Sequence, residues 1–477
     1  MNSDQMTASS VAPFLVKLFS GLASQDIRYV VLRNYEGLPD NVEHDIDLLL
    51  DEIDLPRYRF LLRMTAEACG WRIVRVESRY GFWKCYLYNP DVSGRRFLQI
   101  DAFCPQHYRG IPWFPTSDVL SARQRREIFY VPAAGHEAMD LVLKELLGSG
   151  RVKRRYVPRI VTLLQSDSER FKLATSRTVG QEVASALLHM CRQADCNALD
   201  QQASSLRFAL ALRAWRRQPW AQFVRSLRFI WGHIVKYMRP SGFFICLIGP
   251  DGSGKTSVAD GLCRAMDWTR FQKVHYHHGR FSILPELKKI RQAVARSLRR
   301  YVMGTNKEQH HLFPNRPHSP MRAVSYLLYY TLDYLLGHIL VLHARANGEL
   351  LICDRYFYDY MIQWTFRSLP DWLPWLLARL IPKPDMVVFL SSSAEVIYSR
   401  KQDIPIEEME HQIAICRKLV SRLPNACTVE GDTAVPDVVN RVIDIMMVHM
   451  GARESKRLNS VCSEEHLTSP GDCSGGK

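Results

Sequence analysis

Apolar residues form short runs in the first third of the chain, and these runs predict strands. Residues 27–32, 44–50 and 96–101 each contain several large apolar side chains, and turn-forming residues separate them. Runs of about four to eight such residues between turn signals are typical of buried strands. Residues 11–23 have the apolar spacing of a helix. We therefore predict an α+β domain over residues 1–134.

Residues 135–240 repeat apolar side chains at helical spacing instead, which predicts a helical connector. Its most unusual part is residues 206–238, where tryptophan, phenylalanine and leucine alternate with arginine. A stripe of this kind most often packs between domains while its arginines stay in solvent. A basic helix rich in tryptophan can also lie in the interface of an anionic membrane. We favour packing between domains and keep peripheral membrane contact as the alternative.

The second half of the chain alternates strand and helix patterns, which predicts a doubly wound parallel sheet over residues 241–452. The helical pattern at 321–346 is strongly apolar, but Asp333, His338 and His343 interrupt it, which favours a buried core helix over a membrane span. Residues 453–477 are rich in serine, glycine and charge, which predicts a disordered tail. The predicted strands are 243–248, 273–278, 348–354, 384–390 and 426–431, and the other helices are 258–266, 287–301 and 391–400.

The strand at 243–248 continues directly into a glycine-rich loop that ends in Gly-Lys-Thr. A Gly-x-x-x-x-Gly-Lys-Thr pattern between a strand and a helix is the context of a phosphate-binding P-loop. The glycines let successive N–H groups point at one anion, and the following helix adds its positive dipole end. The lysine can reach the β- and γ-phosphates, and the threonine hydroxyl can bind Mg²⁺. The sequence therefore predicts binding of ATP and Mg²⁺ by Gly249, Asp251, Gly252, Ser253, Gly254, Lys255, Thr256 and Ser257.

A second polar motif follows the strand at 348–354. Asp354 and Arg355 lie at the carboxyl end of this strand, the edge at which doubly wound sheets bind ligands. The carboxylate can organise Mg²⁺, and the arginine can bind a second phosphate with two hydrogen bonds. With the P-loop, the strand at 384–390 and Arg400, this motif resembles the thymidylate kinase family over about residues 240–450. The resemblance implies a kinase with catalytic roles for Lys255, Asp354, Arg355 and Arg400, the last on a mobile lid.

The acceptor of such a kinase is less well defined by the sequence. The resemblance implies that Arg355 holds the phosphate of the acceptor and that Asp251 contacts the acceptor. Thymidylate kinases have an Arg-Glu-Pro segment after the second strand, whereas this chain has His277, His278, Gly279 and Arg280. The thymine-binding contacts therefore do not transfer, and Arg280 is a candidate acceptor contact. We predict ATP-dependent phosphoryl transfer to a nucleoside monophosphate such as dTMP or to another small phosphorylated compound.

Three aspartates mark the N-terminal domain. Asp45 and Asp47 point to the same side of a strand because they are two residues apart, and Asp101 ends another strand. Carboxylates on neighbouring strands can bind one or two Mg²⁺ ions against a triphosphate. This pattern resembles the minimal nucleotidyltransferase family over about residues 12–150, although no Gly-Ser pair precedes it. The resemblance implies metal binding by all three aspartates. The domain is either a nucleotidyltransferase in sugar-nucleotide or surface-polysaccharide metabolism or a domain that only binds a ligand.

Composition adds limits to these functions. The chain has 477 residues and a formal net charge of +15, which favours polyanionic partners such as nucleotides or anionic lipids. No basic and aromatic stripe is regular enough to predict nucleic-acid binding. Twelve cysteines without paired spacing and an N-terminus without a secretory pattern predict a cytoplasmic protein, with membrane contact at most peripheral. An ATP-switched binding module is the non-enzymatic alternative. The oligomeric state is left open, a homodimer included.

Overall fold

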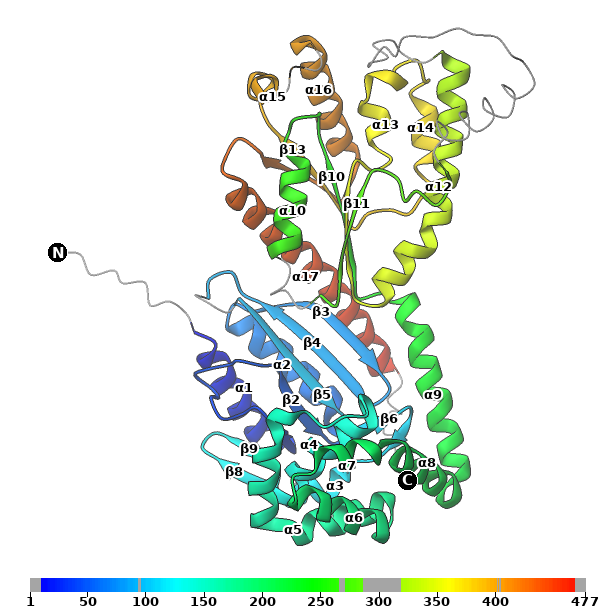
Figure 1. Ribbon diagram of the computed structural model, residues 1–477. Helices are drawn as coiled ribbons and strands as arrows, with labels where there is room; N and C mark the ends of the chain where they lie inside the picture. Colours follow the sequence, from blue (N-terminus) through cyan, green and yellow to red (C-terminus); the bar gives the residue numbers. More distant parts are fainter. Residues whose placement is uncertain are drawn as a thin grey trace, which may run out of the picture. The chain divides into compact units, whose positions relative to one another are not determined.

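The computed structural model describes residues 10–92, 96–265, 271–285, 319–400, 402 and 405–467. The chain divides into two compact units (Figure 1). The first comprises Met1–Lys236 together with Gly451–Lys477, and the second comprises Tyr237–Met450. Helices accompany a mixed sheet in the first unit and a parallel sheet in the second, so the predicted α/β class is confirmed.

A five-stranded mixed sheet forms the centre of the first unit, in the order β1-β2-β5-β4-β3. Strands β2 and β5 run parallel, and the other neighbours are antiparallel. The three predicted strands of this region all form, as β1, β2 and β5. The sheet strands are β1 (Tyr29–Val31), β2 (Ile46–Leu50), β3 (Arg72–Arg79), β4 (Phe82–Tyr88) and β5 (Phe97–Phe103).

Helices cover both faces of this sheet, because strand residues that alternate in direction belong to two separate apolar cores. Val31 and Leu48 pack in one core with α1 (Ala12–Ser24) and α2 (Leu55–Ala68). Val30 and Leu49 pack in the other with α4 (Ala134–Gly148) and α5 (Val157–Val179). Smaller elements connect these layers: η1 (Glu52–Asp54), β6 (His107–Tyr108), β7 (Ile111–Pro112), α3 (Thr116–Ser121), β8 (Gln124–Arg126), β9 (Phe129–Val131) and η2 (Arg154–Tyr156).

The predicted connector is helical but is part of the first unit rather than a separate region. Its helices from α4 onward supply most of the second apolar core, which includes Leu187 of α6 and Leu206 of α8. The domain boundary expected at residue 134 is therefore absent from the described chain, and the division falls at Lys236 instead. The remaining helices here are α6 (Gln181–Arg192), α7 (Cys196–Gln201), α8 (Ala203–Arg217) and α9 (Pro219–Met238).

The second unit is built on five parallel strands in the order β11-β12-β10-β13-β14. Strand β10 (Phe243–Ile248) is central, and its carboxyl end continues into the glycine-rich loop and α10 (Lys255–Ala265). Helices α10 and α12 (Pro320–Ala346) lie on opposite sides of the sheet (Figure 1). The other elements are β11 (Val274–His278), β12 (Leu350–Asp354), α13 (Asp359–Ile362), η4 (Trp364–Phe366), α14 (Trp372–Leu377), β13 (Met386–Ser391), α15 (Ala394–Arg400), α16 (Ile406–Arg422) and β14 (Ala426–Glu430).

Helix α12 differs in part from the buried core helix that we predicted. One side packs into the core of the second unit through residues such as Leu327 and Tyr334. The other side exposes a row of leucine and isoleucine that includes Leu332 and Ile339. By length and composition alone α12 is the one described helix that could cross a membrane, and 39% of its most apolar window is buried. Core helices of soluble proteins pass the same test.

The end of the chain also differs from the prediction. Helix α17 (Val435–Leu467) continues through the first part of the segment that we expected to be disordered. Glu454 of this helix is buried and accepts from Arg457, 3.0 Å away. A buried ion pair can hold such a polar segment in place. The predicted helix at 287–301 and residues 468–477 lie outside the described residues.

Candidate functional site

The glycine-rich loop lies at the carboxyl end of the central strand β10, as predicted. Gly249, Gly252 and Gly254 have φ angles of 153°, 92° and 86°, which side-chain-bearing residues rarely adopt. A Cβ at Gly249 would also lie 2.7 Å from the Ser253 Oγ. Both the turn and the close approach therefore require glycine at position 249. Thr256 and Ser257 follow at the start of α10 and are exposed.

Lys255 turns its ammonium group back into this loop. The Nζ atom donates to the carbonyl oxygens of Gly249, at 2.7 Å, and Pro250, at 2.8 Å. It lies 3.8 Å from the Asp251 carboxylate, and its side chain is almost fully buried. The positive charge is thus held inside the curve of the loop, where a bound phosphate would compete with the two carbonyl oxygens for it.

Asp354 is the centre of a polar cluster at the ends of β11 and β12. Its Oδ2 accepts from the Thr256 hydroxyl at 2.8 Å and from the Tyr276 hydroxyl at 3.3 Å, and it lies 3.2 Å from His278 Nδ1. The side chain is fully buried, yet Oδ1 has no hydrogen-bond partner among the described residues. Burial, with the Asp354 charge next, raises the pKa of Tyr276 to about 12, so the phenol keeps its proton.

Tyr276 and His278 were not predicted as site residues. The parallel register places His278 directly opposite Asp354, and Tyr276 is two residues earlier on the same side. The sequence showed that Tyr276 and His278 share one side of their strand. It did not show that this strand lies next to the one that ends in Asp354, because the order of strands in a parallel sheet depends on the tertiary fold.

Arg355 connects this cluster to the loop. Its Nη2 lies 2.8 Å from Oδ1 of Asp251, so the carboxylate lies near both Arg355 and Lys255. The φ angle of Arg355 is +61°, a strained value for an arginine. Strain of this kind persists where the surrounding structure fixes it, and it is concentrated at binding sites. The predicted proximity of Asp251 and Arg355 is therefore present.

Asp359, in the short helix α13, is a further buried acid that we did not predict. Its Oδ1 has no hydrogen-bond partner among the described residues. Burial raises its pKa to about 7, although the positive charges of Lys255 and Arg355 oppose the shift. The Asp359 carboxyl group therefore changes its charge near neutral pH, close to the positive charges of Lys255 and Arg355.

Buried polar atoms without partners cluster around the loop. Besides Asp354 and Asp359, the hydroxyl oxygens of Ser253 and Ser392 have none among the described residues. Gly431 adjoins the same place, because a Cβ there would lie 2.7 Å from the Ser392 Oγ. Buried polar groups are normally satisfied, so a cluster of exceptions needs an explanation. Phosphate oxygens and a divalent cation with its water would provide the missing partners, and these residues fit such a group.

Two other predicted residues are not brought to the loop. Arg400, at the end of α15, is exposed and makes no hydrogen bond or ion pair with the described residues. Arg280 lies 4.0 Å from the buried Asp333 and over the ring of Tyr330, both in α12. Helix α12 thus supplies a carboxylate and an aromatic face to the Arg280 guanidinium, and the acceptor contact of Arg280 stays a prediction.

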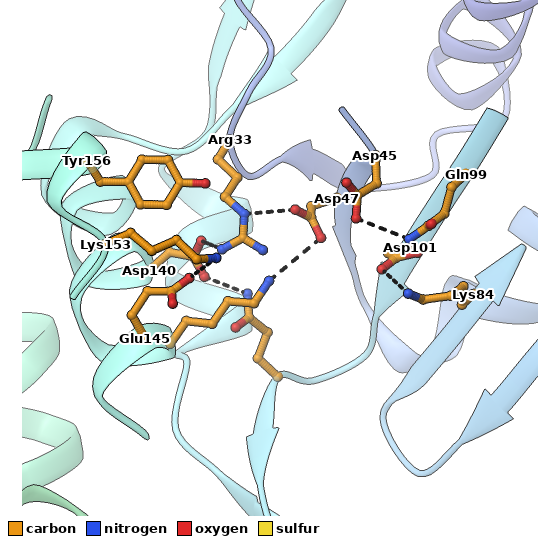
Figure 2. Close-up of polar contacts among 12 residues, drawn as sticks. Arg33, Asp45, Asp47, Lys84, Gln99, Asp101, Asp140, Glu145, Lys153 and Tyr156 are labelled. Carbon is orange, nitrogen blue, oxygen red and sulfur yellow. Dashed lines mark hydrogen bonds and ion pairs between the residues drawn. The ribbon is translucent and has the colours of Figure 1, made fainter. Parts of the chain in front are cut away.

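The three N-terminal aspartates do come together in the first unit (Figure 2). Asp47 of β2 is directly opposite Asp101 of β5, and Lys84 of β4 is opposite Asp101 on its other side. The Gln99 amide donates to Asp45 at 3.1 Å and to Asp101 at 2.9 Å. One face of three adjacent strands therefore holds a row of charged side chains.

Cations of the chain itself neutralise this row. Arg33, which follows β1, donates to Asp47 at 2.8 Å and to Asp140 of α4 at 3.3 Å (Figure 2). Lys84 lies 3.1 Å from Asp101, and Lys144 lies 3.7 Å from Asp47. Burial first, and then the neighbouring carboxylates, raise the pKa of Asp47 to about 7 against the effect of Arg33.

The predicted metal site of Asp45, Asp47 and Asp101 is not formed. No group of three or more His, Cys, Asp or Glu side chains among the described residues is arranged to hold a metal ion. The physical reason is the pairing just described, because an ammonium or guanidinium group faces Asp47 and Asp101 where a cation would bind. Arg33 occupies the region where the Gly-Ser pair of nucleotidyltransferases was missing from the sequence.

A cavity of about 280 Å³ adjoins this row in the first unit. Lys144 reaches it from α4, and Phe229 and His233 of α9 close the opposite side. Burial lowers the pKa of His107, which also lines it, so that this imidazole is neutral at pH 7. The remaining walls are mainly aromatic and come from Phe82, Phe103, Tyr108 and Trp113. No sequence signal identified this cavity, since its walls come from six separate elements.

Comparison with known proteins does not assign the chain to a family. No model of a protein family matches it, and no curated protein is significantly similar to it.

Proposed function

We propose that this protein is an ATP-dependent kinase that transfers a phosphoryl group to a small phosphorylated acceptor, in the manner of the thymidylate kinase group. The observation that supports this most directly is the cluster around the loop. A glycine-rich turn, a buried lysine, an aspartate bonded to the P-loop threonine, and an Asp–Arg pair meet at the carboxyl ends of adjacent parallel strands. Ligands bind at this edge of doubly wound sheets.

In the proposed reaction the loop and α10 bind the triphosphate. Backbone N–H groups of the loop and the first turn of α10 provide donors and a positive dipole end for an anion. Lys255 leaves its two carbonyl partners and donates to the phosphate that is transferred. Phosphoryl transfer depends mostly on positioning and on neutralising the oxygens of the transferred group, and Lys255 contributes to both.

Thr256 and Asp354 would hold a magnesium ion together with the nucleotide. When bound, that ion would neutralise phosphate charge and fix the orientation of the phosphates. Asp354 has one oxygen committed to Thr256, Tyr276 and His278, and a second buried oxygen without a partner. Tyr276 and His278 therefore act as positioning residues, because they fix the plane of this carboxylate.

Arg355 is proposed to bind the phosphate of the acceptor. Asp251 holds the guanidinium at 2.8 Å, and one third of the arginine side chain is exposed, which leaves donors for a ligand. Arginine binds phosphate with two parallel hydrogen bonds and so orients it as well as neutralising it. The acceptor would therefore be a monophosphate, either of a nucleoside or of a sugar.

The experiment is measurement of ADP formation from ATP and Mg²⁺ with separate acceptors. The panel should contain dTMP, the other nucleoside monophosphates and several sugar phosphates. Turnover with one acceptor class supports the proposal and identifies the substrate. ATP binding without turnover for every acceptor would contradict it.

Arg355→Ala separates acceptor binding from ATP binding. We expect the acceptor KM to rise by roughly tenfold or more while the Kd for ATP changes little, since a charged hydrogen-bonded contact is worth about 1.5–3 kcal/mol. Equal loss of ATP and acceptor binding would contradict the role of Arg355. Arg379→Ala, an exposed arginine of the same unit, is the matched control.

Nucleotidyl transfer by the first unit is the second candidate. The row of Asp45, Asp47 and Asp101 supports it, and the pairing with Arg33, Lys84 and Lys144 opposes it. Pyrophosphate release from a nucleoside triphosphate that is lost in Asp101→Asn but kept in Lys255→Ala would favour this candidate. Release that depends on neither residue would exclude it.

A further inference from the structure

Helix α9 packs on the first unit through its polar and small residues. Gln222 is its one described residue that is buried, and its amide donates to the Gly110 carbonyl at 3.3 Å. Phe229 follows on the same side, with its ring 5.6 Å from that of His107. A Cβ at Gly232 would lie 3.4 Å from the Tyr80 backbone nitrogen. Spacings of three and four residues place Gln222, Ser226, Phe229 and His233 on this one inner side.

The rest of α9 exposes its large apolar residues, of which Leu227 and Trp231 also line an open hollow with Ser78 and Tyr80. Trp220, Ile230 and Trp231 are exposed by 75%, 54% and 59%. This orientation is the reverse of that of an ordinary surface helix, whose apolar stripe faces the core. It also differs from the packing that we predicted for this stretch. We call this set the α9 stripe: Trp220, Phe223, Leu227, Ile230, Trp231 and Ile234. Helix α8 adds exposed Phe208, Leu212 and Trp215.

The charge around the α9 stripe has one sign. Residues 203–240 contain seven arginines and one lysine, and no aspartate or glutamate. Arg225 and Arg228 lie between stripe residues in the sequence, and neither forms an ion pair with a carboxylate among the described residues. Arg225 instead has the Gln218 amide oxygen 3.4 Å away. Arg225 also has a side-chain hydrogen bond with Tyr80, so both guanidinium groups keep their positive charge unneutralised by the acids of the described residues.

We propose that the α9 stripe binds the surface of an anionic lipid bilayer. Helix α9 has 20 residues, with tryptophan and aliphatic side chains on one side and only cations among its charged residues. This is the composition of helices that lie in a membrane interface. Tryptophan favours the boundary between headgroups and acyl chains, and arginine binds lipid phosphates. A protein partner that matched this surface would need an acidic, apolar groove. A bilayer provides both properties over the full length of α9, about 30 Å.

The test is flotation of the full-length protein with lipid vesicles. Vesicles of phosphatidylcholine with about 30% phosphatidylserine are compared with vesicles of phosphatidylcholine alone. We expect binding to the anionic vesicles that is at least tenfold stronger, and a decrease of roughly tenfold when salt rises from about 0.1 to 0.5 M. Equal binding to both compositions, or none to either, would overturn the proposal.

Variants locate the contact on α9. Leu227→Gln with Trp231→Gln should weaken anionic-vesicle binding about tenfold or more, because two apolar side chains no longer leave water. Leu173→Gln, an equally exposed apolar residue of α5 in the same unit, should leave binding unchanged. Arg225→Gln with Arg228→Gln should remove most of the preference for phosphatidylserine. Unchanged binding in the Leu227/Trp231 variant would overturn the proposal, provided that circular dichroism shows native helix content.

A second copy of the chain is the competing occupant. Sedimentation velocity without lipid distinguishes a second copy from a bilayer as the occupant. If the protein is a dimer and the Leu227/Trp231 variant is a monomer, the stripe is a self-interface and the proposal is overturned. A single species that the variant does not change supports it. The inference does not depend on kinase activity, so Lys255→Ala should bind vesicles like the unsubstituted protein.

Discussion

The first unit has a row of acidic residues on its sheet, the acidic row (Asp45, Asp47 and Asp101). The second has acidic residues around its glycine-rich loop, the P-loop cluster (Asp354 and Asp359). The two groups differ in whether their buried carboxylates have partners. In the first unit, Asp47 and Asp101 each face a cation supplied by the chain. In the second, Asp354 and Asp359 each retain a buried oxygen without a partner among the described residues. The buried acids of the first cluster are paired with cations of the chain, whereas those of the second lack partners that a ligand would supply.

This difference separates a stabilising role from a binding role. A buried carboxylate that is paired and hydrogen-bonded is stable without a ligand, and loss of its partner is costly. A buried oxygen without a partner makes the folded protein less stable, and binding of a cation or donor removes that cost. We therefore expect substitutions in the acidic row to change stability, and substitutions around the loop to change ligand binding and catalysis.

Arg33→Ala should have the largest effect, on stability. It leaves Asp47 and Asp140 buried without their shared cation, so we expect a loss of about 3–5 kcal/mol in the free energy of unfolding. Urea unfolding measures this. Arg28→Ala is the control, because the Arg28–Asp51 pair has a similar distance of 2.9 Å but is exposed. Such pairs contribute at most about 1 kcal/mol. Equal losses in the two variants would contradict the comparison.

Lys255→Ala should lower activity strongly and the free energy of unfolding only a little. We expect ADP formation to fall by about 10²–10³-fold, because a buried cation no longer reaches the transferred phosphate. The free energy of unfolding should change less than in Arg33→Ala, since the lysine donates to two carbonyl oxygens and the carboxylate nearest to it, Asp251, is partly exposed and keeps Arg355 as a partner. Lys273→Ala, an exposed lysine in the same unit, should keep full activity. A large loss of stability without loss of turnover would refute this assignment.

Asp359 should make the stability of the protein depend on pH. The pKa of Asp359 is about 7 in the folded protein and about 4 when unfolded, so the folded state binds this proton more tightly. Stability therefore falls as pH rises from about 4 to 7 and is level above that. Asp359→Asn does not ionise, so it should flatten this slope and stabilise the protein by about 2 kcal/mol at pH 8.

Asp47 has a similarly raised pKa, so its ionisation should also lower stability as pH rises from about 4 to 7. Asp47→Asn does not ionise and should flatten this part of the slope, but it also takes one of two carboxylates away from Arg33. We therefore expect a smaller stabilisation at pH 8 than in Asp359→Asn. Thermal unfolding of both asparagine variants between pH 5 and 8 measures the contrast. A larger stabilisation by Asp47→Asn would contradict the comparison of the two clusters.

Tyr276→Phe should have the smallest effect. It removes one hydrogen bond to the Asp354 carboxylate, which at 3.3 Å is long and worth about 1 kcal/mol. We expect kcat to fall roughly fivefold with little change in the Kd for ATP. A Mg²⁺ titration of activity should shift to higher concentration, since the carboxylate is less well positioned. An unchanged Mg²⁺ dependence would mean that Tyr276 does not position Asp354.

The part of the site that the sequence predicted is local in the chain. The strand, loop and helix of residues 243–265 formed as expected, because glycine spacing and apolar runs specify them without distant partners. The place of Asp354 and Arg355 at the end of a strand followed from the same kind of pattern. The nucleotide, metal and acceptor roles of these residues stay predictions.

What the sequence did not predict depends on neighbours far away along the chain. Arg33 meets Asp140, and His278 meets Asp354, only because strand order and register bring them together. The helical period of α9 was recognised, but not which side would pack. Periodicity shows that a helix has two different sides. Which one is buried depends on the surface that receives it, here the backbone at Gly110 and Tyr80.

The course of α17 has a consequence for how the protein is made. The first unit consists of residues up to Lys236 and residues from Gly451 onward, so the whole second unit is inserted into it. On the ribosome, domains generally fold as they emerge, beginning at the N-terminus. Here the first unit must wait through more than 200 residues of synthesis before Glu454 and Asn459 arrive, and Asn459 then accepts from Arg63 at 2.8 Å. The first unit to begin folding is the last to finish, and a chain that terminates early at residue 450 would contain a complete second unit and an incomplete first one.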